Sequence, residues 1–500
     1  MIFGLPYYQN IKQFLKGERI IYLFMLLALA LRVHNFSSAS IWYDESVTLK
    51  LAHQSWYDIY LNSTQDVNAP FYHFLMKVWT FVFGYSLSTM RFLSVVCSVL
   101  TVGVIFKLAD KHFGRQVAIL AACFISLSNV HIYYSEEARC YALLCLLSSV
   151  SLYYFLDLLN FPSKKNLILY SIISLLAIYT QLFFGLQIGL TAIILFIKYR
   201  KDVKVLVQLF LWHTLIVIIF SIWFLQTFIV GETIDITDSW IPPLSYENVL
   251  WFFRDVFNHD YLAYVYVGLF MIIIPIGLML LKDKKEIRQK YLFVILLSVI
   301  PFLVMCLYSV FSTSVFYPRF VMFTSIPLFL SISVGLSQTM GNKALLSVLI
   351  IPFVFASMNV NVFAFRNQDW NIACRYEWAF RNDNTSTIVS PSYSDMCYIY
   401  YNMDWAYFQE YKNLWYYKEE RKFIGCDDSL QYMNSKFAKS KRVVFFDASP
   451  DYDDRIIQFL RNNYDSVCAK QLYGINFYVF DKKTLEVKDS INSIRSPSPR

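Results

Sequence analysis

Long apolar runs separated by short polar connections make up most of this chain. The runs lie near residues 18–36, 91–109, 116–134, 139–160, 166–182, 185–199, 205–229, 261–281, 291–311, 320–339 and 344–364. A helix needs roughly 20 mainly apolar residues to cross the hydrocarbon core of a bilayer. The pattern therefore predicts a polytopic α-helical membrane protein with about 11 transmembrane helices.

The connections between the runs fall into two classes by charge. Five of them hold most of the lysines and arginines: Lys111–Arg115, Lys164–Lys165, Lys198–Lys204, Lys282–Lys290 and Lys343. Positively charged loops are typical of the cytoplasmic side of a membrane. An odd number of spans with the N-terminus inside therefore puts the other connections and the C-terminal region outside the cytoplasm.

One apolar stretch, Pro70–Phe83, is shorter than most of the others, carries Lys77 and is rich in aromatic residues. The basic loops all lie in the cytoplasm only if this stretch does not cross the membrane. A crossing there would invert the topology of every later span. We therefore predict an interfacial helix at this position.

Two long outside loops follow from this topology, at 37–90 and 230–260. We predict an amphipathic helix at Ser46–Leu61 in the first loop and a surface helix at Tyr246–Phe257 in the second. Together with the spans, these loops make residues 1–365 a single transmembrane domain.

The composition turns polar at Arg366. From there short β-rich runs alternate with helical stretches, which predicts a small extracytoplasmic α/β domain at 366–487. A tail at 488–500 is predicted to be disordered. The predicted strands are Thr387–Ser390, Arg442–Phe446 and Phe477–Phe480, and the predicted helices are Asp369–Phe380, Ser429–Ala438 and Asp453–Asn462.

Composition and charge agree with a membrane protein. Hydrophobic residues make up 57% of the 500 positions and charged residues only 16%, whereas a soluble protein carries about a quarter charged residues. The net charge of +8 would suggest nucleic acid as the partner of a soluble protein. Here the basic residues lie beside spans, where anionic lipid headgroups attract them, so we predict the lipid bilayer and no nucleic acid as partner. Lys12, Lys16 and Arg19 precede the run Ile20–Leu31, as in a signal anchor.

Nine cysteines give no sign of a metal site, because there is no CxxC motif and no Cys/His cluster. Five of them lie in apolar runs and are interpreted as packing residues. The other four lie in the polar C-terminal region, where an oxidising compartment would allow one or two disulfides whose pairing stays open. These four are Cys374, Cys397, Cys426 and Cys468.

The first group of candidate site residues is Trp42-Tyr43-Asp44-Glu45, just after the first span. Ionisable residues close to a bilayer are costly to bury, so they usually mark a function. Aromatic neighbours would desolvate a carboxylate and raise its pKa toward that of a general base. The alternative is that Asp44 lies in water and caps a helix Glu45–Leu61. The spacing alone does not decide between the two.

A second group lies in the segment His131-Ile-Tyr-Tyr-Ser-Glu-Glu-Ala-Arg-Cys-Tyr141. Ser135 as an N-cap, with Glu136 and Glu137 in the first helical turn, would be ordinary helix chemistry. That interpretation does not explain why three charges, a histidine and three tyrosines gather at one membrane boundary. The candidates here are His131, Tyr134, Glu136, Glu137, Arg139 and Tyr141.

Three further motifs each allow two interpretations. Pro70 and Tyr72 in Asn-Ala-Pro-Phe-Tyr either only begin a helix or line a site. Arg91 either extends to the headgroups or pairs with the acids of its own loop. Arg319 in Tyr-Pro-Arg-Phe either extends to the headgroups as well or clamps a phosphate at the bilayer surface.

The chain contains no Walker loop and no GxGxxG motif, so nothing indicates a nucleotide site. An activated donor used outside the cytoplasm would then have to arrive through the membrane, attached to a lipid.

These motifs, in this order, resemble the GT-C superfamily of membrane glycosyltransferases. The nearest branch is the bacterial one akin to dolichyl-phosphate-mannose protein mannosyltransferases and lipid A aminoarabinose transferases. The resemblance is dense over the first 160 residues, rests mainly on hydropathy in the middle, and is loose in the C-terminal domain. It is carried by Trp-Tyr-Asp44-Glu45, Asn-Ala-Pro70-Phe-Tyr, Phe83-Gly84 with Arg91-Phe-Leu-Ser94, the segment His131–Tyr141, Tyr-Pro-Arg319-Phe and Gln368-Asp369-Trp370.

The resemblance implies a GT-C-like fold in the bacterial inner membrane, with the active site on the extracytoplasmic side. It implies inverting transfer of a sugar from a polyprenyl-phosphate-linked donor to a hydroxyl of a cell-envelope glycan, lipid or protein. In such enzymes the acid at the position of Asp44 is the general base, and its neighbour Glu45 positions that base or the substrate. An arginine stabilises the departing lipid phosphate, with Arg319 the first candidate and Arg139 or Arg91 the second. The substrate-binding candidates are Tyr43, Pro70, Tyr72, His131, Tyr134, Glu136, Glu137 and Tyr141.

The chain departs from the aminoarabinose transferases at two positions. They place a phosphate-binding lysine where this chain has Ala69, and an aspartate near the position of Tyr141. Phosphate binding must therefore differ, and no metal site is carried over from them. Glu136 and Glu137 would be the acids to hold a divalent ion with Asp44, but we predict no metal and no cofactor.

Two other functions compete with an enzyme. A multi-spanning transporter or lipid flippase would be expected to show internal repeats and midplane polar residues, whereas the charges here gather at one boundary. A catalytically inert scaffold that presents the C-terminal domain would leave the carboxylate and arginine clusters unexplained.

Overall fold

The chain divides into two compact units. The structure, a computed structural model, describes residues 17, 19–34, 36–65, 68–230, 241–339, 353–354, 368–391, 394–402, 423–425, 440–448 and 455–483. The helical unit consists of residues 1–38 and 51–365, and the sheet unit consists of residues 39–50 and 366–500. The short segment 39–50, which carries Asp44 and Glu45, thus belongs with the C-terminal region and not with the spans that flank it.

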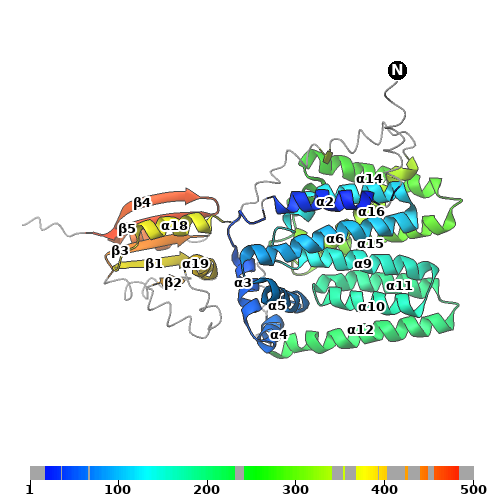
Figure 1. Cartoon of the computed structure of the whole chain (residues 1–500), viewed down its shortest axis with the longest axis horizontal. Coiled ribbons are helices and arrows are strands. Elements are labelled where there is room, and N and C mark those ends of the chain that lie inside the picture. The colour runs from blue at the N-terminus through cyan, green and yellow to red at the C-terminus, as the bar shows by residue number, and fades with distance from the viewer. Residues whose placement is uncertain are drawn as a thin grey trace, which may run out of the picture. The chain divides into compact units, whose positions relative to one another are not determined.

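The helical unit is built from apolar helices that lie side by side, with α9 between α6 and α10 and with α12 next to α10 (Figure 1). In the described part of the chain, six helices are long and apolar enough to cross a membrane, and three shorter ones are apolar. In chain order the elements of this unit are α2 (Ile20–Val33), α4 (Trp56–Gln65), α5 (Phe71–Phe83), α6 (Leu87–Phe113), α7 (Arg115–Leu127), α8 (Asn129–Tyr133), α9 (Tyr141–Asn160), α10 (Lys164–Ile178), η1 (Leu182–Phe184), α11 (Gly185–Lys198), α12 (Val203–Val230), α13 (Tyr246–Phe257), α14 (Asp260–Leu280), α15 (Lys285–Phe311), η3 (Pro318–Thr324) and α16 (Ser325–Thr339).

Every predicted span from 18–36 to 320–339 overlaps a helix, but 116–134 is divided into α7 and α8 and 320–339 into η3 and α16. The last predicted span, 344–364, lies outside the described residues except for 353 and 354. The prediction of a multi-pass helical membrane protein is confirmed, while the count of 11 is not tested. The surface of α12 is that of a membrane helix: apolar side chains such as Phe228 and Ile229 are 71% and 79% exposed. A continuous apolar surface of this kind is stable in lipid and not in water.

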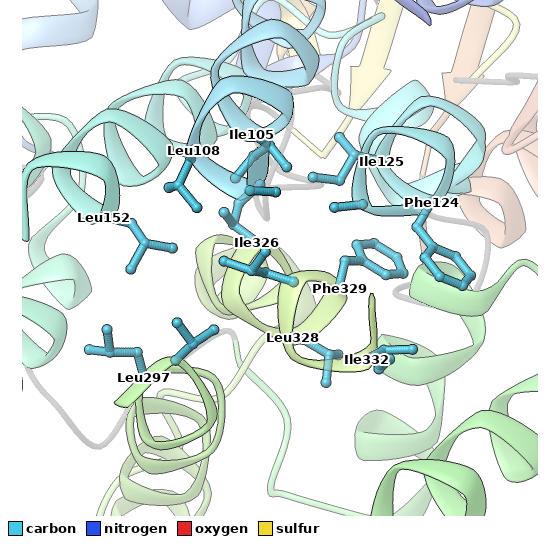
Figure 2. Close-up of a cluster of buried hydrophobic side chains, with 14 of the residues drawn as sticks. Ile105, Leu108, Phe124, Ile125, Leu152, Leu297, Ile326, Leu328, Phe329 and Ile332 are labelled. Atoms are coloured by element: carbon cyan, nitrogen blue, oxygen red, sulfur yellow. The ribbon is translucent and has the colours of Figure 1, made fainter. Parts of the chain in front are cut away.

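The core of the helical unit surrounds α16. Figure 2 shows Ile326, Leu328, Phe329 and Ile332 of this helix among side chains from α6, α7, α9 and α15. The ring of Phe329 stacks on Phe124 of α7 with centroids 5.5 Å apart. Because lipid removes most of the hydrophobic drive for helix association, close packing of this kind is what holds membrane helices together.

A small residue allows α14 and α16 to approach each other closely. A Cβ atom added at Gly335 would lie 2.1 Å from Cγ2 of Ile273 and 2.8 Å from the hydroxyl of Tyr291. Glycine is therefore required at this helix crossing, as small residues are at many membrane helix interfaces.

The first predicted outside loop differs from the prediction in one respect. The expected helix Ser46–Leu61 is two helices, α3 (Tyr43–His53) and α4 (Trp56–Gln65). The break comes from Ser55, whose hydroxyl accepts a hydrogen bond from the backbone N–H of Asp58 at 3.1 Å. A serine in this position caps a new helix and so favours ending the previous one.

The stretch predicted to be interfacial is α5, a helix of 13 residues. Such a helix is about 20 Å long, which is shorter than the roughly 30 Å hydrocarbon core of a bilayer. Its first residue, Phe71, donates a backbone hydrogen bond to the carbonyl of Tyr179 at 2.9 Å. Because α7 also has only 13 residues, length alone does not separate α5 from the spans, and the interfacial position of α5 stays a prediction.

The sheet unit contains a five-stranded sheet in the order β2-β1-β3-β5-β4. Strand β1 pairs in parallel with β2 and β3, and β5 runs antiparallel to β3 and β4. The strands are β1 (Thr385–Ser390), β2 (Phe423–Gly425), β3 (Arg442–Asp447), β4 (Tyr464–Leu472) and β5 (Ile475–Lys482), and the helices of this unit are α18 (Trp370–Phe380), α19 (Asp395–Asn402) and α23 (Arg455–Asn463).

The three predicted strands are the three central ones, because buried strands read as runs of apolar residues. The prediction missed the edge strands β2 and β4. Strand β4 is mostly exposed and carries Asp465 and Lys470, so its sequence lacks that signal. The predicted helices Asp369–Phe380 and Asp453–Asn462 correspond to α18 and α23. The predicted helix Ser429–Ala438 and the predicted disordered tail lie outside the described residues.

The thiols of Cys374, Cys397 and Cys468 are free, and Cys426 lies outside the described residues. The first two of these thiols are fully buried. The disulfides that the sequence left open are therefore not formed by these three cysteines.

Candidate active site

The predicted site residues lie in both units. Asp44 and Glu45 are in the first turn of α3, in the part of that helix that belongs to the sheet unit. The other candidates, apart from Tyr43, belong to the helical unit. The prediction that Asp44 and Arg319 act at one site stays a prediction.

The environment of the first acidic pair differs between its members. Glu45 is fully buried, whereas Asp44 is partly exposed. Because α3 begins at Tyr43, Asp44 is a first-turn residue and not the cap of a helix that starts at Glu45, so the capping interpretation is wrong. The first helical turn still favours a negative charge through the helix dipole.

The segment between α8 and α9 does not begin a helix at Glu136. Residues 134–140 form turns, and α9 begins only at Tyr141. The hydroxyl of Ser135 donates a hydrogen bond to the carbonyl of Ile132 at 2.6 Å instead of capping a helix. The alternative interpretation of Glu136 and Glu137 as ordinary first-turn residues is therefore wrong, and another reason is needed for two buried carboxylates.

Two fully buried arginines lie near the carboxylate of Glu136. Arg91 in α6 and Arg32 in α2 both lie close enough for their charges to lower the pKa of this carboxyl. Burial has the larger effect and raises the pKa of Glu136 from 4.5 to about 8. Since Arg91 is buried, the interpretation that it extends to the headgroups is wrong. The group as a whole is a site of excess positive charge, because near neutral pH Glu136 holds its proton much of the time.

Arg32 is a residue that the sequence prediction missed. Its guanidinium donates to the Ser98 hydroxyl at 2.7 Å and to the carbonyls of Ala28, Ser126 and Ile125, each at 3.1 Å. The available signal was a single arginine inside a run that otherwise reads as a span, which by itself suggests a function. Arg32 did not stand out from the predicted span because a hydropathy window averages over a single charge.

Glu136→Gln should flatten the pH dependence of stability. The raised pKa means that the folded state binds the proton more tightly than the unfolded state. Its contribution is therefore fully present below pH 4.5 and is lost as the pH rises through about 8. The variant should accordingly unfold at a higher temperature than the unmodified protein above about pH 8, with a smaller difference near pH 5.

Thermal unfolding of the protein in detergent micelles, followed by intrinsic fluorescence across this pH range, measures the effect. Glu247→Gln is a matched control, because Glu247 lies in the first turn of α13 and is exposed. Parallel curves for the Glu136 variant and the unmodified protein would contradict the assignment of a protonated buried carboxyl.

A second acidic group lies next to the tyrosines of the same segment. Although the Tyr133 side chain is 43% exposed, desolvation raises the pKa of its hydroxyl, and its hydrogen bond with Glu137 and the charge of Asp255 raise it further. Partial desolvation also raises the pKa of Asp255, against the effect of Arg254, although its side chain is 42% exposed. The prediction placed a surface helix at this position but did not single out Asp255.

The end of α13 is attached to the junction between α7 and α8, which brings Asp255 close to Tyr133. Asn258 ends the helix with a left-handed backbone (φ 69°). Its side chain accepts from the backbone N–H of Asn129 at 2.6 Å and donates to the carbonyl of Leu127 at 2.9 Å. Asparagine tolerates this conformation better than most residues, so the tether depends on its identity.

Arg319 lies among aromatic rings at the start of η3. Its guanidinium carbon is 4.8 Å from the ring centre of Tyr317, 5.7 Å from that of Phe320 and 5.9 Å from that of Tyr141. Cation–π contacts of this kind orient a guanidinium without using up its N–H donors. Its charge also acts on the hydroxyl of Tyr134, so Arg319 lies near the segment that contains Glu136 and Arg139.

The remaining candidates connect α5 and α16 to the same segment. Pro70 stands at the N-cap position of α5, as predicted for a helix start. Tyr72 is fully buried near Ser94 and Arg139. His131 faces Ser325 of α16, with Nε2 and Oγ 2.9 Å apart. The described part of the chain contains no group of three His, Cys, Asp or Glu residues arranged to hold a metal ion.

Comparisons with known proteins agree with this architecture. Residues 67–224, about a third of the chain, match the model of the dolichyl-phosphate-mannose-protein mannosyltransferase family. A comparison with curated protein sequences finds no significant match.

Two solved structures of ArnT from Cupriavidus metallidurans have a similar fold at 11% sequence identity. The apo form has a TM-score of 0.57 and covers 92% of this chain and 97% of its own. The form bound to undecaprenyl phosphate has a TM-score of 0.56 and covers 93% and 98%. A weaker likeness, with a TM-score of 0.47 at 11% identity, links 85% of the chain to 69% of the Archaeoglobus fulgidus oligosaccharyltransferase. The resemblance seen in the sequence is therefore confirmed: the chain shares the fold of ArnT, and over residues 67–224 it is similar to the dolichyl-phosphate-mannose-protein mannosyltransferase family.

Proposed function

We propose that this protein is a GT-C membrane glycosyltransferase that transfers a sugar from a polyprenyl-phosphate-linked donor to a hydroxyl. The acceptor is a cell-envelope glycan, a lipid or a protein, and the reaction takes place on the extracytoplasmic side of the membrane. The family match supports the class of reaction, and it spans α5 to α12 with Tyr72, Arg91 and Arg139. The fold shared with a protein that binds undecaprenyl phosphate supports the class of donor.

The observation that carries the proposal is the buried charge around residues 134–141. Arg32 and Arg91 are fully buried beside Glu136, and Arg139 acts on the buried groups of Tyr72 and His73. Burying an ion costs several kcal/mol even after relaxation, so the burial of Arg32 and Arg91 favours a function for this charge. Excess guanidinium charge next to aromatic rings is the chemistry that recognises a phosphate.

In the proposed reaction the acceptor hydroxyl gives its proton to the carboxylate of Asp44 while its oxygen attacks the anomeric carbon of the sugar. The bond from that carbon to the phosphate oxygen breaks, and the electron pair leaves with the lipid phosphate. A single displacement of this kind inverts the configuration of the sugar. Glu45 assists Asp44, and Arg319 receives the departing phosphate, with Arg139 or Arg91 as the next candidates. The substrate is bound by Tyr43, Pro70, Tyr72, His131, Tyr134, Glu136, Glu137 and Tyr141.

Purified full-length protein incubated with a panel of polyprenyl-phosphate sugars tests the proposal. We expect mass spectrometry to detect free lipid phosphate for at least one donor, in an amount that increases when a matching hydroxyl acceptor is added. Movement of the lipid or its sugar across proteoliposome membranes without any cleavage would instead support the transporter or flippase interpretation.

A further inference from the structure

The segment that carries Asp44 and Glu45 is held by side chains of the sheet unit. The first anchor is Ser40, which is buried. Its hydroxyl donates to Oδ1 of Asn371 at 2.9 Å and accepts from the backbone N–H of the same residue at 3.2 Å. Asn371 is the second residue of α18, where backbone N–H groups have no partner inside the helix. Ser40 therefore accepts a hydrogen bond from an otherwise unpaired backbone N–H at the start of a helix that lies more than 300 residues further along the chain.

The second anchor follows directly. The backbone N–H of Ile41 donates to the hydroxyl of Tyr401 at 3.0 Å, and Ile41 itself is fully buried. A buried backbone N–H without an acceptor is costly, so this hydroxyl supplies a bond that the segment requires. Tyr401 is in α19, one helical turn after Cys397.

The third anchor lies on the other side of the two carboxylates. Ser46 hydrogen-bonds the thiol of Cys397, which partly opposes the rise in the pKa of that thiol caused by its burial. The charges of Glu45 and Asp44 also act on the thiol, so both carboxylates lie close to α19. Because Tyr401 and Cys397 are four residues apart, they share one face of this helix.

The two helices that provide these anchors are themselves fixed to the sheet. The buried carboxylate of Glu377 in α18 accepts hydrogen bonds through Oε1 from Thr387 of β1 at 2.5 Å, from Tyr398 of α19 at 2.9 Å and from Arg381 at 3.0 Å. One carboxylate thus connects α18, α19 and the sheet. Anchors on α18 and α19 are therefore rigid with respect to each other.

From this arrangement we infer that the sheet unit positions the general base. Ser40, Asn371 and Tyr401 act as positioning residues that hold the backbone on the N-terminal side of Asp44. This inference rests on the proposed function, because it takes Asp44 as the base. A base must lie within hydrogen-bond reach of the proton that it removes, and a misplacement of about 1 Å can cost roughly 100-fold in rate.

Tyr401→Phe in the full-length protein tests the inference, because it removes only the hydroxyl that accepts from Ile41. We expect kcat to fall about tenfold or more, with little change in KM for the lipid donor, since the donor phosphate is bound elsewhere. Ser40→Ala, which removes the first anchor, should have the same pattern. Tyr376→Phe is the matched control, because Tyr376 lies in the same unit and packs its ring on Phe477 with centroids 5.9 Å apart.

A second measurement separates positioning from a general loss of structure. In an Asp44→Asn background, Tyr401→Phe should cause no further loss of the residual activity, because it acts through Asp44. Thermal unfolding of each purified variant shows whether the fold is retained. A lower kcat only in variants that also unfold earlier, or the same loss with and without Asp44, would overturn the inference.

The outcomes also distinguish the inference from the function on which it rests. If Asp44→Asn keeps full activity, the assignment of the base fails. If Asp44→Asn is inactive while Tyr401→Phe and Ser40→Ala both keep the kcat of the unmodified protein, only the positioning role fails.

Discussion

Asp44→Asn should lower the rate of sugar transfer about 100- to 10,000-fold while leaving the protein folded and able to bind its donor. Asparagine has the shape of aspartate but cannot take up the proton of an acceptor hydroxyl. Loss of a general base typically costs 10²–10⁴-fold in rate, so the variant should keep only a small residual activity of that order. The rate of release of free lipid phosphate, measured by mass spectrometry with saturating donor and acceptor, is the readout.

The matched control for this variant is Asp465→Asn, which makes the same change at an exposed position of β4. Donor binding and thermal unfolding of the Asp44 variant should be unchanged, because α3 keeps its other contacts. Full transfer activity in this variant would remove Asp44 from the mechanism.

Arg319→Ala should weaken binding of the lipid donor more than binding of the acceptor. A charge-assisted hydrogen bond is worth about 1.5–3 kcal/mol, and each 1.4 kcal/mol is tenfold in affinity. The apparent dissociation constant for the donor should therefore rise roughly 10- to 100-fold. Arg319→Lys should give an intermediate value, because lysine keeps the charge but loses the planar fork that matches a phosphate.

Titration of the purified protein with a labelled polyprenyl phosphate, with and without the sugar, measures this constant. Arg375→Ala is the control, since Arg375 is an exposed arginine of α18. An unchanged affinity for the lipid phosphate would count against Arg319 and direct attention to Arg139 and Arg91.

Much of the fold could be predicted from the sequence, because the signals involved are local. A bilayer-length apolar run forms a helix whatever its neighbours are, so the positions of α6, α9, α12, α14 and α15 follow from hydropathy alone. The three central strands follow in the same way from short apolar runs. The break between α3 and α4 and the edge strand β4 depend on single capping contacts or on exposed positions, and these leave a weaker pattern.

The candidate site was only partly accessible to the same reasoning. Arg91, Glu136 and Glu137 could be singled out because charges are rare near spans. Whether they begin a helix, reach the headgroups or are buried together could not be decided from their spacing. Arg32 was not singled out because one charge hardly changes the mean hydropathy of a span. Asp255 was not singled out because a charged residue is ordinary on a surface helix. The catalytic and binding roles of the candidate residues named from the sequence stay predictions.

By itself the sequence determined that this chain spans a membrane, ends in an α/β region and resembles the GT-C glycosyltransferases, because apolar length, charge distribution and ordered motifs are properties of consecutive residues. Only the tertiary structure decided that Glu136 is buried near Arg32 and Arg91, and that the segment of Asp44 is attached to α18 and α19. These contacts join residues up to 360 positions apart. Such pairing depends on how the helices and the sheet pack and leaves no mark in the local order of the residues.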